Sequence, residues 1–436
     1  MLMNLSQESQ TEEELKNKNY NNFFIFWIGQ LFSIMGSEIV QFAIVVWLAL
    51  ETQSPIIMSL SMLLAFLPGI IIGPFAGVLV DHWNKKLVLI ISDSLQAMAT
   101  LCLIILFFMD FANIWFVIGL NLFRAIFQAF HSPSFITVVT LMVPKEKLTR
   151  INGLIQFSTA IIKMIGPILG AIILSVWSIQ NVLWIDIISF LFALIFLLFI
   201  KIPVIKNLGG EKKPKLNFIL KFKEGFSIIN KVSGLWSLLL LAMLTNFLLM
   251  PINTLFSLYI LIDHAGSNFD LAIVSAAMQF AFVAGALFVS IKKTWKNKVM
   301  VFLIGILLVF IGIIIIALAP YQKFWIMIIG GIIGFFGVPI LNALMISIVQ
   351  IIIPPEAMGR VSSILGFLSS IASPLGIILS GPLAELIGIS KLFLFSGIIG
   401  ILTTLITYSF SSLRNLKNFT IKENSIKNEI ERNNEQ

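Results

Sequence analysis

Twelve long apolar runs constrain what this chain can fold into. A helix needs about 20 apolar residues to cross the hydrocarbon core of a bilayer, and each run is close to that length or longer. Hydrophobic residues make up 58% of the 436 residues, charged residues 11%, and the mean hydropathy is +1.01. A soluble protein could not bury so much apolar surface, so this composition excludes cytosolic enzymes, secreted domains and disordered chains. We expect an all-α membrane protein with spans at residues 23–50, 57–80, 87–109, 114–143, 151–177, 182–200, 235–262, 269–291, 299–319, 324–353, 361–383 and 390–410.

One long polar stretch inside the chain divides these spans into six plus six. It covers residues 201–234. The domain boundaries that follow are an N-terminal tail at 1–22, a six-helix bundle at 23–200, a central loop at 201–234, a second six-helix bundle at 235–412 and a C-terminal tail at 413–436.

The positions of the 29 Lys and Arg residues predict the orientation in the membrane. With the N-terminus on the cytoplasmic side, 25 of them fall in the tails and loops of that side. Only Lys323 and Lys391 fall on the opposite side, and Arg124 and Lys163 lie inside spans. Cytoplasmic loops carry an excess of Lys and Arg, so both termini and the central loop are expected in the cytoplasm. Membrane orientation then explains the formal net charge of +8, because the excess of Lys and Arg lies in cytoplasmic loops. We therefore expect no nucleic acid partner.

The two halves carry traces of a duplication. Pro144, Glu146 and Arg150 recur 210 residues later as Pro354, Glu356 and Arg360, and the same offset relates Phe157 to Phe367 and Gly166 to Gly376. Parallel six-helix repeats, related by an axis along the membrane normal, characterise one large class of transporters. In that class the substrate site lies near the bilayer midplane between the halves.

The segment after the second span carries a recognisable motif. It reads Gly73-Pro-Phe-Ala-Gly77-Val-Leu-Val-Asp81-His-Trp-Asn-Lys85-Lys86, which resembles the loop between spans two and three in the major facilitator superfamily. A glycine late in a span lets two helices approach closely, and an aspartate suits a helix N-terminus. The resemblance implies that Gly77, Asp81, Lys85 and Lys86 form a cytoplasmic gate. Positive-inside topology alone would also explain the two lysines.

Within that superfamily, the chain most resembles the drug/proton antiporter branch that holds macrolide-efflux and siderophore-export proteins. Further motifs carry this resemblance: Trp27-x-Gly29-Gln30, Ser54-Pro55, Asn152-Gly153, Ser189-Phe190 and Glu224-Gly225. The sequence Gly166-Pro167-x-x-Gly170 resembles the antiporter signature of exporters. Proline removes a backbone hydrogen bond and glycines permit tight helix packing, so Gly166, Pro167 and Gly170 are expected to form a hinge or a seal.

Five ionisable residues lie inside predicted spans, where charge is costly and marks functional candidates: Glu38, Asp93, Arg124, Lys163 and Asp186. Glu38 is the expected proton-coupling site, because a carboxyl group in a low-dielectric environment is tunable by its neighbours. Two alternatives remain, a structural salt bridge from Glu38 to Arg124 and a role in substrate recognition alone.

The other intramembrane polar groups have more limited expected roles. Arg124 stays charged at any working pH and would tune an acid, and Asp93 is a second coupling candidate. Structural hydrogen bonds are the favoured interpretation for both Asp93 and Asp186. Lys163 faces either the substrate cavity or the membrane surface. For His131 a proton relay is possible, but a satisfied polar side chain at the kink of Pro133 is the favoured interpretation.

The substrate cavity is expected to be mostly apolar with a few polar groups. Its candidate polar side chains are Gln30, Gln41, Gln128, Lys163, Asn246, Asn253 and Asn342. No phosphate-binding loop and no metal-ligand spacing occurs in the sequence, so we expect no cofactor, no metal and no enzyme activity.

The sequence therefore predicts a proton-driven exporter of lipophilic or amphipathic small molecules, acting in the cell membrane as a monomer, with its substrate, protons and the lipid bilayer as partners. One alternative is a facilitator or symporter of a specific metabolite. A second is a receptor on a transporter fold that transports nothing.

Overall fold

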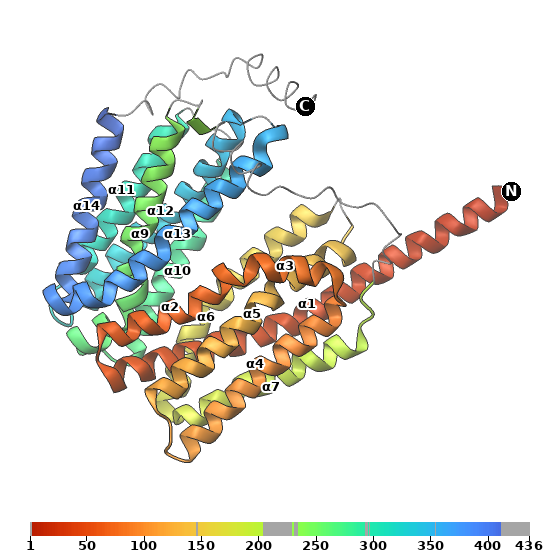
Figure 1. The fold of residues 1–436 in the computed structure, drawn as a ribbon, viewed down its shortest axis with the longest axis horizontal. Coiled ribbons are helices and arrows are strands. Elements are labelled where there is room, and N and C mark those ends of the chain that lie inside the picture. The colour runs from red at the N-terminus through yellow and green to blue at the C-terminus, as the bar shows by residue number, and fades with distance from the viewer. Residues whose placement is uncertain are drawn as a thin grey trace.

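The computed structural model describes residues 2–144, 147–203, 229–230, 234–292, 295, 297–353 and 355–410. Side chains are described from residue 20 onward, except at some positions in α3, α6, α12, α13 and α14. Throughout these ranges the secondary structure is helical (Figure 1). The predicted central loop and C-terminal tail lie almost entirely outside the described residues.

The first half of the chain forms helices that follow the predicted spans closely. They are α1 (Leu2–Thr52), α2 (Pro55–Ile71), α3 (Gly73–His82), α4 (Lys85–Phe108), α5 (Ile114–Met142), α6 (Leu148–Val176) and α7 (Ile179–Phe199). Two differences stand out. Helix α1 begins at Leu2, inside the segment predicted as a tail, and the span predicted at 57–80 is divided into α2 and α3 at Ile72.

The second half repeats the pattern. It contains α9 (Leu235–Leu258), the π-helix η2 (Tyr259–Asp263), α10 (Asn268–Ile291), α11 (Lys298–Ala317), α12 (Phe324–Ile352), α13 (Pro355–Ile387) and α14 (Ile389–Phe410). By length and hydropathy, ten helices among the described residues could cross a membrane, and the apolar segments Pro55–Ile71 and Ile371–Ile387 are shorter. The all-α membrane fold is thus confirmed, and the count of twelve spans stays a prediction.

Polar caps start several of these helices at the positions where the chain turns back into the bundle. The Ser54 hydroxyl accepts from the Ile57 amide, with Pro55 in the first turn of α2, and Asn84 accepts from the amides of Lys86 and Leu87 at the start of α4. Ser267 and Asp270 form a reciprocal capping box at α10. Such side chains satisfy amides that the first helical turn leaves unpaired, so α2, α4 and α10 each begin at a defined residue.

The two halves meet at the end of the bundle where α1 finishes and α2 begins. There the Ser54 hydroxyl donates to Glu385 at 3.3 Å, and Gly381 of α13 lies so close to α2 that a Cβ would be 2.7 Å from the Cα of Ile56. Helix α1 also contacts η2. We call this end the closed end. In Figure 1 the helices of the two halves diverge away from it, toward the end where α1 begins.

Packing of the buried side chains agrees with this arrangement. One large apolar cluster combines core residues of the second half with those residues of the first half that lie toward the closed end, such as Ile44, Leu48 and Leu103. The opposite end of the first half packs as a separate cluster around Phe23, Phe26 and Leu197. The halves therefore share a core at the closed end and have separate cores at the other end, which we call the open end.

Candidate transport site

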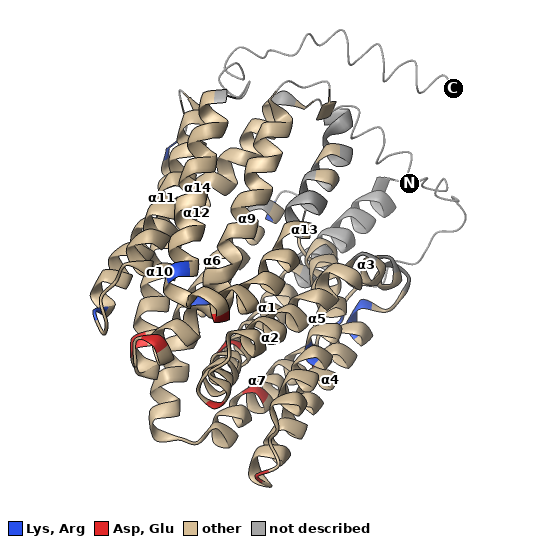
Figure 2. Ribbon diagram, turned by 60° about the vertical axis from the view of Figure 1, so that its left-hand side comes forward, with Lys and Arg blue, Asp and Glu red and all other residues tan. Residues whose placement is uncertain are grey.

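A cavity of about 560 Å³ lies within the first half, between α1, α4, α5 and α7. This volume is in the range of small-molecule sites. Its lining is polar for a membrane protein: Gln30, Ser33, Ser37, Glu38, Gln41, Asp93, Gln96, Arg124, Gln128, His131, Ser132 and Asp186, with apolar residues among them. A second cavity of about 620 Å³, lined also by α2, shares Gln41, Gln96, Arg124, Gln128 and Ser132 with the first. Little charge interrupts the described spans elsewhere (Figure 2).

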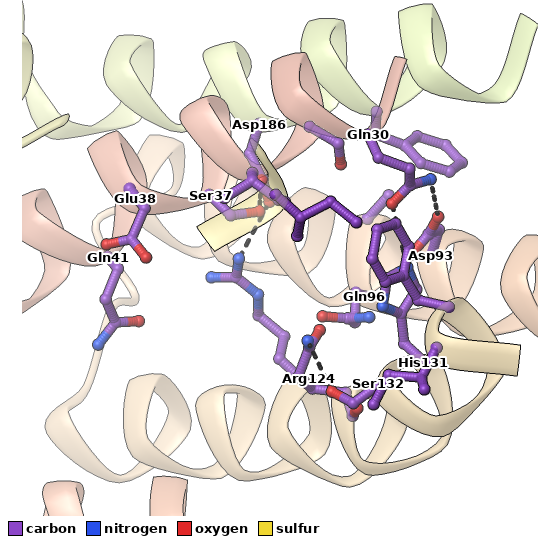
Figure 3. A pocket seen from close by; sticks show the side chains of 18 residues that line it. Gln30, Ser37, Glu38, Gln41, Asp93, Gln96, Arg124, His131, Ser132 and Asp186 are labelled. Carbon is purple, nitrogen blue, oxygen red and sulfur yellow. Dashed lines mark hydrogen bonds and ion pairs between the residues drawn. The ribbon is translucent and has the colours of Figure 1, made fainter. Parts of the chain in front are cut away.

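Asp186 is the centre of the most completely bonded group in the cavity. Its Oδ1 accepts from the Ser37 hydroxyl at 2.8 Å, and its Oδ2 accepts from the Thr100 hydroxyl at 2.6 Å. Arg124 Nη2 donates to the same Oδ2 at 3.2 Å, which makes a buried ion pair (Figure 3). Three donors from three different helices thus surround this carboxylate. We call Ser37, Thr100, Arg124 and Asp186 the deep layer.

A second polar group lies nearer the open end. His131 Nε2 is 3.3 Å from Asp93 Oδ1 and 3.2 Å from Gln30 Oε1, and Gln30 Nε2 donates to Asp93 Oδ2 at 3.5 Å. Figure 3 shows these three side chains together, on one side of Arg124. We call them the mouth layer.

The two layers are built from the same three helices. Gln30 and Ser37 are seven residues apart in α1, as are Asp93 and Thr100 in α4 and Arg124 and His131 in α5. Seven residues are two helical turns, or about 10 Å of rise, and place both members on one helix face. The cavity wall therefore carries two polar layers about 10 Å apart, and α7 contributes Asp186 to the deep one.

Glu38 is the acid that these layers leave without a partner. It lines the cavity beside Gln41 (Figure 3), and it accepts no hydrogen bond from a described residue. Neither the ion pair between Arg124 and Asp186 nor the contact between His131 and Asp93 includes Glu38. The nearest influence of opposite charge is Lys163 on α6, which is exposed and interacts with the Glu38 carboxylate electrostatically.

Two glycines bring α6 against α1 at this acid. A Cβ on Gly166 would lie 2.9 Å from the Cβ of Glu38, and one on Gly170 would lie 2.8 Å from the Phe42 ring. Real Cβ atoms do not approach other atoms so closely, so glycine is required at both positions for this packing. The Gly166-Pro167-x-x-Gly170 motif therefore sets the position of Glu38 in the cavity wall. A hinge at Pro167 stays a prediction.

Known proteins show where this arrangement belongs. The family model of the Major Facilitator Superfamily matches residues 26–377. This chain belongs to that family. It is 31% identical to macrolide efflux protein A of Streptococcus pyogenes over 403 residues, which is 92% of this chain and 99% of the relative. A protein of the same name from Enterococcus faecalis is 31% identical over 324 residues, which is 74% of this chain and 99% of the relative.

Solved structures agree with the family in fold. A bacterial homologue of the iron transporter ferroportin, crystallised in an inward-facing state, matches with a TM-score of 0.67 at 13% identity, covering 89% of this chain and 99% of that one. The chain is thus a multi-pass transporter of the Major Facilitator Superfamily in the cell membrane, as its sequence predicts.

The predicted site residues separate into those that the cavity brings together and those that it does not. Glu38, Asp93, Arg124, Gln30, Gln41 and Gln128 all line it. In the second half, Asn253 lines a separate cavity of about 120 Å³, Asn342 is exposed on α12, and Asn246 donates to the Ala242 carbonyl at 3.1 Å. The cavity lining also contains Ser37, Gln96 and Ser132, which the sequence did not single out.

Two sequence expectations are wrong. The alternative of a Glu38–Arg124 salt bridge fails because Asp186 pairs with Arg124 instead. The expected close helix approach at Gly77 fails because a Cβ there would meet open space.

One residue of the expected gate loop, Lys86, contacts the end of α7 in this structure. Lys86 Nζ donates to the carbonyls of Leu198 and Ile200 at 2.9 and 2.7 Å, and so caps the C-terminus of α7 within the first half. The side chain of Asp81 lies outside the described residues, so the gate itself stays a prediction.

The glycine packing at Glu38 gives a first testable expectation. Gly166→Ala should destabilise the protein by about 1–3 kcal/mol, because the methyl group overlaps Glu38 and the two helices must separate. Gly119→Ala in α5 is the matched control, since a Cβ there would meet nothing within 4 Å. Unfolding in mixed micelles titrated with SDS measures both. Equal effects of the two substitutions would contradict the packing.

Proposed function

We propose that the protein is a proton-driven exporter of lipophilic and amphipathic small molecules, with macrolides as the model substrate. Two macrolide efflux relatives at 31% identity support the substrate class. The cavity supports it as well, since it combines polar side chains on α1, α4 and α5 with apolar side chains such as Ile34, Phe135 and Phe190. Mixed linings of this kind suit molecules with an apolar body and a few polar groups.

Glu38 couples transport to protons in this proposal. A membrane-embedded acid that releases and takes up a proton needs a charged form that is not permanently stabilised. Asp186 accepts from three donors and Asp93 from one amide and one imidazole, whereas Glu38 has no hydrogen-bond donor among the described residues. Glu38 is therefore the acid whose charged form the described neighbours stabilise least, and the charge of Lys163 acts on it.

The proposal includes alternating access of the cavity to the two sides of the membrane. In this proposal the open end is cytoplasmic, as the distribution of Lys and Arg predicts, so the cavity would receive its substrate from inside the cell. Release outside requires the closed end to separate. That change would break the contact between Ser54 and Glu385 and the close packing of Gly381 on α2, while the two halves approach each other at the open end.

Uptake into inverted membrane vesicles tests this function. Vesicles acidified inside should accumulate radiolabelled erythromycin against its gradient, and collapsing the pH gradient with nigericin should release it. Vesicles without the protein are the control. Erythromycin movement that ignores the pH gradient, or that runs in the direction of proton flow, would contradict proton antiport and favour the facilitator or symporter.

A further inference from the structure

The mouth layer repeats the design of the deep layer with one decisive difference. Both layers place a basic side chain of α5 against an aspartate, which comes from α7 in the deep layer and from α4 in the mouth layer, with a polar side chain of α1 bonded to the aspartate. The base in the deep layer is Arg124, whose guanidinium is always charged. The base in the mouth layer is His131, and imidazole is the basic side chain type that can change its charge near physiological pH. The cation of the deep layer is thus fixed, whereas the basic group of the mouth layer is of a type that can change its charge.

We propose that the mouth layer is a second proton-binding site, separate from Glu38, in which His131 takes up one proton and Asp93 balances its charge. Uptake of this proton raises the net charge of the mouth layer by one. The site goes beyond the proposed coupling through Glu38, and only its effect on substrate movement rests on the proposed export.

The hydrogen bonds around His131 identify the nitrogen that titrates. Nε2 faces two acceptors, Asp93 Oδ1 and Gln30 Oε1, so it carries a hydrogen in either charge state. Nδ1 has no hydrogen-bond partner among the described residues. The proton therefore exchanges between Nδ1 and water in the cavity, which His131 lines. Gln30 fixes the ring by bonding both to Nε2 and to Asp93 Oδ2.

The remaining charged groups around the cavity do not replace Asp93 as the partner of His131. Arg124 of α5 is already paired with Asp186 of α7. Glu38 of α1 lies on the far side of Arg124 in Figure 3, with Lys163 of α6 as its opposite charge. The contribution of α6 to the lining is the apolar Ile155. One aspartate and one amide are thus the polar partners of this imidazole.

Nuclear magnetic resonance of the full chain in nanodiscs, with ¹³C-labelled histidine, tests the site without any substrate. The chain has three histidines, and the signal of His131 is the one that His131→Gln and His131→Arg both remove. We expect that signal to titrate reversibly within about pH 5 to 8. Asp93→Asn should move its midpoint by about one pH unit or more, because an opposite charge in contact is lost. Glu38→Gln should move it much less.

Two outcomes would overturn the site: a His131 signal that does not titrate across this range, or a midpoint that Asp93→Asn leaves in place. Transport provides an independent arm. His131→Arg replaces the imidazole with a guanidinium that is always charged, as in the deep layer. Erythromycin uptake should then lose the part of its pH dependence that lies between about pH 5 and 8. Titration without any transport would retain the proton site and contradict the proposed export. Proton-driven transport without titration at His131 would support the proposed export and contradict the second proton site.

Discussion

Asp186→Asn should destabilise the protein by about 3–5 kcal/mol, the range for breaking a buried ion pair by removing one partner. The cause is the charge left behind. Arg124 is 8% exposed, and its Nε and Nη1 atoms are buried without a partner among the described residues. Asp186 is therefore the carboxylate that compensates its charge, and asparagine keeps the shape of the side chain but not the charge.

Unfolding in SDS-containing mixed micelles measures this effect, with two variants as controls. Asp93→Asn makes the same chemical change in the mouth layer, where His131 can shed its proton, so its cost should be smaller, about 1 kcal/mol. The double variant Arg124→Met with Asp186→Leu removes both charges and should recover most of the lost stability. The Thr100 hydroxyl keeps an acceptor in that variant, the Gln96 carbonyl at 3.2 Å. Equal costs for Asp186→Asn and Asp93→Asn would contradict the ion pair's role.

Glu38→Gln should abolish proton-driven accumulation of substrate and leave substrate exchange intact. Glutamine fills the same space in the cavity wall and remains polar, so the binding of the substrate changes little. It cannot release or take up a proton, so the pH gradient no longer biases the direction of transport. Glu38→Asp retains an acid and should keep coupled transport at a reduced rate. Glu385→Gln removes an acid at the closed end, outside the cavity, and should remain coupled.

The spans were predictable because hydropathy is a local property. Every predicted span overlaps a helix of the structure, and most ends agree within a few residues, as at α5, predicted at 114–143 and found at Ile114–Met142. The break between α2 and α3 at Ile72 was harder to predict. Pro74 indicates an interruption of the helix, but it does not determine whether one helix bends or a second helix begins. Similarly, the apolar content at 235–262 does not reveal the π-helix at Tyr259–Asp263.

The partners of the buried charges were harder to predict, because they depend on how helices rotate against one another. Depth along the helices still carries a signal. Arg124 is ten residues from the closed-end start of α5, and Asp186 is seven from that of α7, so the two lie at a similar level at 1.5 Å per residue. Glu38, fourteen residues before the end of α1, likewise matches Lys163, thirteen before the end of α6. Comparing depths would have favoured Asp186 as the ion-pair partner of Arg124, and Lys163 as the charge that acts on Glu38.

The seven-residue spacing within α1, α4 and α5 was also present in the sequence. It could not be recognised there, because glutamine, serine and threonine are common in helices and only their shared contacts with Asp93 and Asp186 give them meaning. Gly77 shows the opposite case. The glycine of a recognisable motif has no close neighbour in this structure, so a motif predicts the fold more reliably than the contact.

Proton flux through proteoliposomes tests the central claim, that Glu38 couples substrate export to protons. Purified wild-type protein and the Glu38→Gln variant are reconstituted under an imposed pH gradient, and erythromycin is added while a pH-sensitive dye reports proton movement. Exchange of labelled for unlabelled erythromycin, without a gradient, shows that the variant is folded and binds substrate. We expect drug-dependent proton flux from the wild type and exchange without proton flux from the variant. Drug-dependent proton flux that persists in Glu38→Gln would contradict the account and assign coupling to another acid of the cavity.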